Sequence, residues 1–226
     1  MELFARPVTL RLAETFRIAR ESKDEAVVAC VELRHDGVRG FGEAAPIARY
    51  SESAGSTLAY LQEVAELVGD DPFALDEIES RLPGGERAAR AALDAALHDL
   101  QGKLLGIPVW RLLGLRQHGP PTSWTIGLGD PDEMARKAEL ARGRFRRLKL
   151  KLGGGDGLDV ERVRAVRAVS DVPLQVDANE YWSLVEALEA LPQLADLGVE
   201  YCEQPLPAGD EGGSELKRRS PIPIYV

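Results

Sequence analysis

Phe145-Arg146-Arg147-Leu148-Lys149-Leu150-Lys151-Leu152-Gly153 is the segment that says most about the fold. In a β-strand, residues two apart face the same side. Lys149 and Lys151 are therefore predicted to share one face of a strand, and the leucines to share the other. Such a strand suits a sheet that packs helices on its leucine side and holds a closed polar site on its lysine side. Taken alone, solvated lysines at a strand end are the simpler interpretation.

The same alternation recurs in two later runs, residues 173–179 and 198–205. Each run is followed by Gly, Pro or polar residues and then by a helical pattern. The predicted polar faces hold Gln175, Asp177 and Asn179 in the first run, and Val199, Tyr201 and Glu203 in the second. Three successive strands would thus carry ionisable groups at their C-terminal ends, which is typical of a (β/α) barrel with a site at that end.

These residue types point to a particular chemistry. Carboxylates on adjacent strands suit a hard cation such as Mg²⁺, and lysines beside it suit proton abstraction. Two crowded ammonium groups disfavour each other's charge, which is expected to lower a lysine pKa toward the range of a base. Taken singly, Asp177 could be a helix cap and Asn179 a turn residue, whereas Glu203 before Gln204-Pro205 has no evident structural role.

The composition is that of an ordinary globular protein. The chain has 226 residues, of which 44% are hydrophobic and 29% charged, with a formal net charge of -9. The negative charge argues against nucleic acid as a partner, because a backbone-binding face needs clustered Lys and Arg. No apolar run approaches the roughly 20 residues of a membrane helix, and the N-terminus lacks a signal-peptide core. We therefore expect a cytoplasmic protein without a membrane or nucleic-acid partner.

Two regions differ in rhythm. The first predicts a small antiparallel sheet with strands near 8–12, 27–33 and 41–44, a hairpin turn at Asp36-Gly37, and polar loops at 14–25 and 48–55. Helices are predicted over 56–68, 74–81 and 86–105. The second region alternates strand and helix, which predicts parallel strands with right-handed crossovers. Its strands are expected near 123–128, within the runs 145–153, 173–179 and 198–205, and from 221, with helices from 130 or 131 to about 142 and near 158–169, 183–196 and 210–219.

Six segments occur in an order and spacing that are specific together, although each alone is weak. They are Gly40–Pro46, Ala48–Ser53, Ala91–Leu100, Leu148–Gly153, Val176–Asn179 and Glu203–Leu206. Together they resemble the enolase superfamily, in its muconate-lactonizing subgroup, and within it the dipeptide epimerases and the related N-acylamino-acid racemases. The resemblance covers essentially the whole chain. It implies an α/β protein in which an α+β capping domain, residues 1–115, accompanies the first half of a modified (β/α) TIM-like barrel, residues 116–226 with strands 1–5.

The resemblance also implies roles for particular residues. Asp177 and Glu203 would be carboxylate ligands of one Mg²⁺, with Asn179 in or next to the coordination shell. Lys151 would remove the α-proton of a carboxylate substrate, while Lys149 would hold that carboxylate and depress the pKa of Lys151. The loops at 14–25 and 48–55, with Arg20 and Tyr50, would select the substrate side chain. Arg20 would grip an acidic group, since guanidinium binds carboxylate bidentately.

The activity implied is Mg²⁺-dependent epimerisation of dipeptides of the Ala-Glu type through an enediolate. The alternatives within the class are an N-acylamino-acid racemase, for example of N-acetylglutamate, and an o-succinylbenzoate synthase or cycloisomerase. The expected partner is a small-molecule substrate, and assembly into a homo-oligomer is compatible with the resemblance. An alternative of another class is an inactive truncated remnant that serves only in binding.

Two parts of the site that the resemblance implies are not found in the 226 residues. The third carboxylate ligand and a second lysine, on the opposite face of the substrate, would both follow Val226. We therefore expect the 226 residues to be a fragment of a longer parent, inactive or nearly so alone, unless a partner supplies the rest. An open barrel edge would also invite aggregation or pairing.

Overall fold

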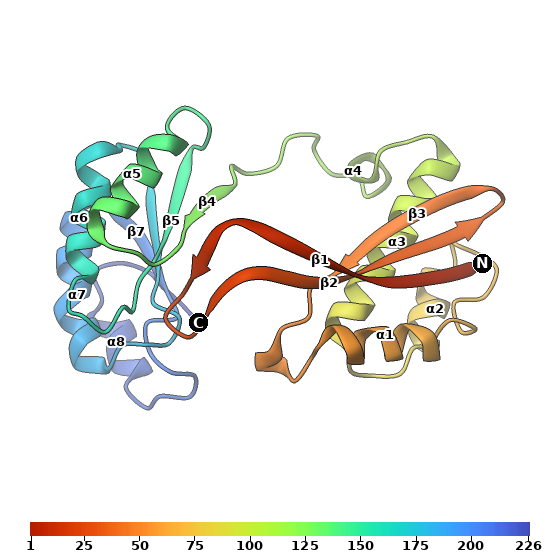
Figure 1. The fold of residues 1–226 in the computed structure, drawn as a ribbon, viewed down its shortest axis with the longest axis horizontal. Helices are drawn as coiled ribbons and strands as arrows, with labels where there is room; N and C mark the ends of the chain where they lie inside the picture. The colour runs from red at the N-terminus through yellow and green to blue at the C-terminus, as the bar shows by residue number, and fades with distance from the viewer. The chain divides into compact units, whose positions relative to one another are not determined.

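The computed structural model describes residues 1–226 as two units, each with its own hydrophobic core (Figure 1). Unit 1 comprises Met1–Leu12 and Glu25–Gly119, and unit 2 comprises Ala13–Asp24 and Pro120–Val226. None of the helices is both long and apolar enough to cross a bilayer.

Unit 1 contains a three-stranded sheet in the order β1-β2-β3. Its strands are β1 (Glu2–Arg17), β2 (Ser22–His35) and β3 (Val38–Ala44), and β2 pairs antiparallel with β3. Asp36 and Gly37 join them with φ angles of 48° and 76°, as the favoured two-residue hairpin turn requires, so this predicted turn is confirmed. The predicted polar loop at 14–25 is shorter than expected. The strands continue into it, and the Thr15 hydroxyl donates to the Asp24 carboxylate across 2.5 Å.

One long helix covers this sheet. The predicted helix over 86–105 is observed as α3 (Arg87–Leu105), whose Leu93, Leu97 and Leu100 are buried. Gly42 of β3 faces it closely, because a side chain there would overlap the carbonyl of Ala92. The remaining helices of the unit are η1 (Ala48–Tyr50, a 3₁₀ turn), α1 (Ala54–Glu63), α2 (Leu75–Arg81) and α4 (Val109–Leu112). The predicted helix over 56–68 ends early, and the apolar residues that follow α1 are buried in turns.

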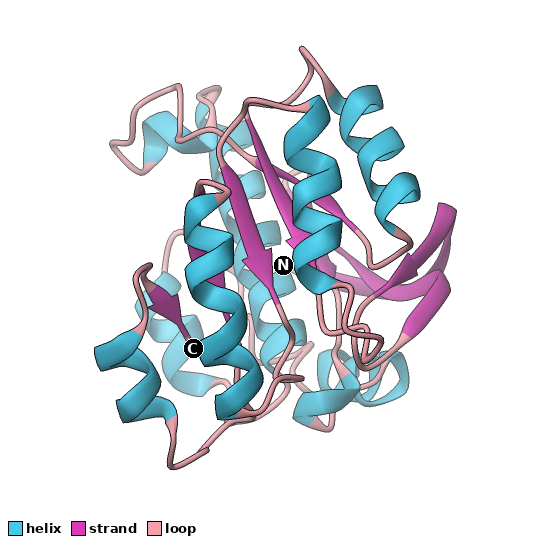
Figure 2. Cartoon of the chain, turned by 90° about the vertical axis from the view of Figure 1, so that its left-hand side faces the viewer, coloured by secondary structure: helices cyan, strands magenta, loops and turns pink.

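Unit 2 is a five-stranded parallel sheet in the order β4-β5-β6-β7-β8. The strands are β4 (Ser123–Ile126), β5 (Arg147–Lys151), β6 (Leu174–Asp177), β7 (Val199–Glu203) and β8 (Ile224–Tyr225). The helices between them are α5 (Pro131–Ala141), α6 (Asp159–Val169), α7 (Leu184–Asp196) and α8 (Gly213–Arg219). These helices cover one face of the sheet (Figure 2). The predicted α/β class, with a partial barrel of parallel strands, is confirmed.

The core of unit 2 lies between sheet and helices. Leu148 and Leu150 of β5 are 2% and 0% exposed, so the leucine face of residues 145–153 is the buried one. One expectation for β7 is wrong: Val199 belongs to this core rather than to the face that carries Glu203. The register is Leu174 with Val199 and then Val176 with Cys202, so β7 has one residue more than β6 in this interval. That extra residue shifts the alternation of side chains.

Candidate functional site

The carboxyl ends of β5, β6 and β7 meet side by side. Lys151 is in register with Asp177, and Asp177 with Glu203. The Lys151 ammonium donates to Asp177 Oδ2 at 2.6 Å, and the Lys149 ammonium lies 2.5 Å from Glu203 Oε2 and 3.3 Å from Asp177 Oδ2. Four of the predicted site residues therefore form one connected cluster at the end of the sheet where ligands of parallel α/β proteins bind.

The pair between Asp177 and Lys151 is largely shielded from solvent. The Asp177 side chain is 1% exposed and that of Lys151 12%. Burial by itself would raise the pKa of Asp177, but the hydrogen bond and charge of Lys151, with the charge of Lys149, hold that pKa below its usual value. The carboxylate therefore stays ionised.

The pKa of Lys149 moves against the expectation that crowded ammonium groups lower a lysine pKa. Burial alone would lower the pKa of Lys149, but the carboxylates of Glu203 and Asp177 outweigh burial and raise it. Each ammonium group lies within hydrogen-bond distance of a carboxylate on another strand of the sheet. Strand alternation shows which residues share a face, but it does not show the counter-charges on the neighbouring strands.

Asn179 lies immediately beyond β6 and not within the strand. Its φ angle is 50°, and its backbone N–H donates to Asp177 Oδ1 at 2.8 Å. Its side-chain oxygen Oδ1 is buried and has no hydrogen-bond partner. A buried acceptor without a partner is uncommon and indicates that something else uses it.

The donor set fits a hard cation. Asp177, Glu203 and Asn179 offer oxygen atoms only, which Mg²⁺ and similar ions prefer. Both carboxylates approach the same Lys149 ammonium, so both can approach one centre of positive charge. The 226 residues contain no group of three or more His, Cys, Asp and Glu side chains that could hold a metal ion.

The two predicted substrate-binding residues lie in different units. Arg20 belongs to unit 2, where its guanidinium forms an ion pair with Glu180 at 2.8 Å, beside the loop that follows β6. Tyr50 belongs to unit 1, on η1, where it is 55% exposed and its ring lies 5.9 Å from the Arg87 guanidinium. The selective roles of Arg20 and Tyr50 stay predictions.

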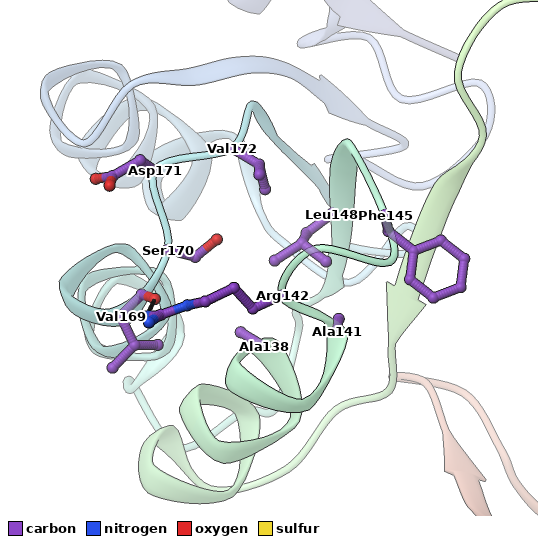
Figure 3. A pocket seen from close by; sticks show the side chains of 9 residues that line it. All are labelled: Ala138, Ala141, Arg142, Phe145, Leu148, Val169, Ser170, Asp171 and Val172. Carbon is purple, nitrogen blue, oxygen red and sulfur yellow. Dashed lines mark hydrogen bonds between the residues drawn. The ribbon is translucent and has the colours of Figure 1, made fainter.

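A pocket at the opposite end of the sheet does not belong to this site. Its volume is about 430 Å³, and it lies where β5 and β6 begin (Figure 3). Apolar side chains such as Phe145 and Leu148 line it, and its arginine, Arg142, donates to the Val169 carbonyl. It contains none of the paired lysines and carboxylates, so the chemistry remains at the carboxyl ends.

A group of charged residues on α6 was not predicted from the sequence. Arg162 and Asp159 lie among valines of this helix, and Arg162 is 3% exposed. An arginine flanked by buried valines is a usable signal of a paired internal charge. Asp159 lies at i,i+3 spacing on the same helix and Asp156 just before it, whereas the contact with the Gly129 carbonyl, 33 residues away, cannot be identified from helical periodicity.

The comparisons agree with this fold. Residues 1–114 match the model for the mandelate racemase / muconate lactonizing enzyme N-terminal domain, and residues 133–226 match the enolase C-terminal domain-like model. The chain belongs to the enolase superfamily, in the mandelate racemase and muconate lactonizing enzyme family. The resemblance inferred from the sequence motifs is thereby confirmed.

Relatives of known structure or activity include dipeptide epimerases. The chain is 35% identical to the L-Ala-D/L-Glu epimerase of Bacteroides thetaiotaomicron, with 97% of this chain and 58% of that protein covered. It is 41% identical to the L-Ala-D/L-Glu epimerase of Escherichia coli, with 92% and 64% covered. The dipeptide epimerase of Enterococcus faecalis, solved with Mg and L-Leu-L-Tyr, superposes with a TM-score of 0.92 at 32% identity, with 99% of this chain and 66% of that chain covered. The chain thus spans about three fifths of the length of these curated relatives.

Proposed function

We propose that the full gene product catalyses Mg²⁺-dependent epimerisation of a dipeptide of the Ala-Glu type, by removal of the α-proton on one face and its return on the opposite face by a second group that is not among the residues of this cluster. The observation that supports this most is the cluster at the carboxyl ends of β5, β6 and β7. It brings two lysines within hydrogen-bond distance of two carboxylates on neighbouring strands. Proton abstraction next to a carboxylate needs a base and a concentration of positive charge, and this cluster offers both.

Each side chain has a proposed task. Lys151 is the base that accepts the α-proton, for which it must first lose a proton and its hydrogen bond to Asp177. Lys149 holds the substrate carboxylate and places the α-carbon before Lys151. Asp177 and Glu203 would hold the metal ion, with the unpartnered oxygen of Asn179 as a further oxygen donor. When bound, Mg²⁺ supplies positive charge that stabilises the enediolate left by proton removal.

The relatives support the substrate class. The first curated relatives are named L-Ala-D/L-Glu, hydrophobic dipeptide and L-Ala-D/L-amino acid epimerases. We propose from these names a small dipeptide substrate for this protein. The acidic preference rests on Arg20, whose guanidinium lies beside the loop after β6. Cytoplasmic location and homo-oligomeric assembly stay predictions.

A second candidate is racemisation of an N-acylamino acid. The N-succinyl Arg/Lys racemase of Bacillus cereus superposes with a TM-score of 0.88 at 29% identity over 99% of this chain. The same lysines and carboxylates would serve, because both substrates carry an acylated nitrogen and a carboxylate on the reacting carbon. A cycloisomerase has a comparable neighbour in the muconate lactonizing enzyme of Pseudomonas fluorescens, with a TM-score of 0.90 at 30% identity.

Deuterium incorporation tests the proposal. The full gene product is incubated with Mg²⁺ in D₂O and with L-Ala-L-Glu, other L-Ala dipeptides or N-acetylglutamate, and the α-proton is followed by NMR. We expect exchange at the C-terminal residue of a dipeptide. Exchange with N-acylamino acids alone would select the second candidate, and the absence of exchange with every substrate would refute both. The non-catalytic alternative predicts no exchange and no stabilisation by Mg²⁺.

A further inference from the structure

A buried arginine lies beside the loops that hold the site. The Arg162 side chain of α6 is 4% exposed. Its Nε donates to the Gly129 carbonyl at 2.8 Å, and its two terminal nitrogens donate to the two carboxylate oxygens of Asp156 at 2.8 and 2.5 Å. One of these nitrogens also donates to Asp159 Oδ1 at 3.0 Å. The N–H groups of the planar guanidinium therefore donate to three partners at once.

The second carboxylate oxygen of Asp159 extends this set of hydrogen bonds to two further loops. Asp159 Oδ2 accepts the backbone N–H of Gly153 at 2.9 Å and the indole N–H of Trp182 at 2.7 Å. Gly129, Gly153 and Trp182 follow β4, β5 and β6, respectively. We call the side chains of Asp156, Asp159, Arg162 and Trp182 the Arg162 network. It joins three successive loops at the end of the sheet that carries the site.

Two of these loops continue β5 and β6, which carry the proposed base Lys151 and the proposed ligand Asp177. Gly153 comes two residues after Lys151, and Trp182 three residues after Asn179. Gly153 has a φ angle of 87°, and a Cβ there would lie 2.7 Å from the Tyr181 Cβ, so the loop after β5 packs tightly on the loop after β6. The path of the backbone just after Lys151 therefore depends on how Gly153 is held.

Stability alone is a weak reason for such a network. Burying the guanidinium of Arg162 and most of the Asp159 carboxylate costs desolvation that the ion pairs only partly offset, and apolar side chains of similar volume often stabilise a core as well. A fully paired polar network does fix one geometry, because each hydrogen bond restricts its neighbours. That rigidity is what a base near a reacting atom requires, since displacement by about 1 Å can cost about 100-fold in rate.

We propose that Arg162 and Asp159 are positioning residues, which hold the loops after β5 and β6 so that Lys151 and Asn179 keep a fixed direction toward Asp177. This inference rests on the proposed function for its catalytic consequence. The structural consequence, ordering of the loops around Gly153 and Trp182, is independent of that function.

Two other arginines of α6 provide matched controls. Arg167 is also partly buried, and it donates to the carbonyls of Leu197, Ser170 and Val172 near the other end of the helix. Arg164 is 51% exposed and pairs only with Glu161. Arg162→Gln and Arg167→Gln should both lower the melting temperature, because each removes a multiply bonded arginine. Arg164→Gln should change it little.

Kinetics separates positioning from stability. Arg162→Gln and Asp159→Asn should lower kcat about 10- to 100-fold with KM nearly unchanged, as loss of a group that orients a catalytic residue does. Arg162→Lys should not restore kcat, because one ammonium group cannot replace a planar guanidinium that donates to three partners. Arg167→Gln should keep kcat at a temperature where it is folded. Equal kcat values for Arg162→Gln and Arg167→Gln would overturn the proposal.

The indole N–H of Trp182 gives a readout that needs no activity. Its NMR resonance is identified by its loss in Trp182→Phe. In Arg162→Gln and Asp159→Asn it should shift, and its hydrogen exchange should accelerate at least about tenfold, whereas Arg167→Gln should leave it unchanged. An unchanged Trp182 resonance in both network variants would contradict the proposal. If Arg162→Gln does not fold, Asp156→Asn should show the same changes to a smaller degree.

A protein without α-proton exchange would refute the proposed function, but the Trp182 measurement would still decide whether the network orders the loops. The two failures are therefore distinguishable: the first appears in the wild-type protein, and the second only in the variants.

Discussion

Asp177 faces two ammonium groups, and this crowding determines how the site responds to substitution. Lys151 donates to Asp177 at 2.6 Å, while Lys149 is shared between Asp177 and Glu203. The lysines thus pair with the same carboxylate oxygens that would hold a cation. The sequence was enough to select these four residues, because strand alternation and the order of the strands place them on neighbouring C-terminal ends. The raised pKa of Lys149 was not predictable, since it depends on side-chain distances between strands.

Substituting the proposed base tests its role. Lys151→Ala should abolish α-proton exchange in the full gene product, because the substitution removes the amine that is proposed to accept the α-proton. Lys217→Ala, which removes an exposed lysine of α8, should leave exchange unaltered. The rates are compared by NMR in D₂O. Full activity in Lys151→Ala would show that another residue is the base.

Substituting the buried ligand tests cation binding. The wild-type protein should melt at a higher temperature in Mg²⁺, because a ligand of the native state stabilises it. Asp177→Asn should lose this increase, whereas Asp171→Asn, at an exposed aspartate near the start of β6, should retain it. Differential scanning calorimetry with Mg²⁺ and with a chelator measures the effect. A full Mg²⁺ response in Asp177→Asn would place the ion elsewhere.

The Asp156 ion pair predicts a dependence on pH. The hydrogen bond from Arg162 lowers the pKa of Asp156 from 3.8 to about 2. Because the folded-state pKa is the lower one, the pair stabilises the protein above about pH 4, and this contribution is lost as the pH falls toward 2. The Asp156 side chain is 42% exposed, so solvent screening limits the contribution to about 1 kcal/mol.

Urea unfolding between pH 6 and pH 2 measures this contribution. The difference in unfolding free energy between the wild-type protein and Asp156→Asn should shrink toward zero as the pH falls through this range. A difference that stays constant with pH would mean that the ion pair does not form in solution.

Among the secondary-structure elements, alternation predicted the strands well and their ends less well. The leucine and lysine faces of β5 follow directly from a period of two residues. The extra residue in β7 places Val199 in the core between the sheet and the helices, and nothing in the sequence marks that bulge. Asn179 left the strand for a left-handed turn, and β1 and β2 extended into a segment whose polar residues resemble a loop. The pairing of Asp159 with Arg162 follows from helical spacing, but the contacts of the Arg162 network with Gly129 and Trp182 depend on tertiary packing and were not predicted.

The contact between β3 and α3 yields a prediction for unit 1. Gly42→Ala should destabilise the protein by about 1–3 kcal/mol, because the added methyl group would overlap the Ala92 carbonyl of α3. Gly84→Ala is the control, since nothing lies within 4 Å of a Cβ at that position. Chemical denaturation of both variants makes the comparison. Equal stability of the two would show that β3 and α3 are not packed this closely.

Across the molecule as a whole, the chain is organised as two cores joined by its longest strands. Residues 13–24, from the ends of β1 and β2, group with unit 2 rather than with the rest of their sheet. The Arg17 carbonyl accepts the Leu128 N–H at 2.8 Å, and Glu14 pairs with Lys137 at 3.2 Å. Arg20 thereby becomes part of the unit that carries the lysines. The capping region thus contributes a segment to the unit of the proposed site, which alternation within the first 44 residues could not indicate.

The proposed function depends above all on one divalent-cation site, formed by adjacent strand ends of unit 2 beside two lysines. Anomalous diffraction from crystals of the protein grown with Mn²⁺, as a substitute for Mg²⁺, locates such an ion without reference to activity. We predict a strong peak between the carboxylates of Asp177 and Glu203, with the side-chain oxygen of Asn179 facing it. A peak elsewhere, or none at saturating Mn²⁺, would show that these strand ends do not form the cation site.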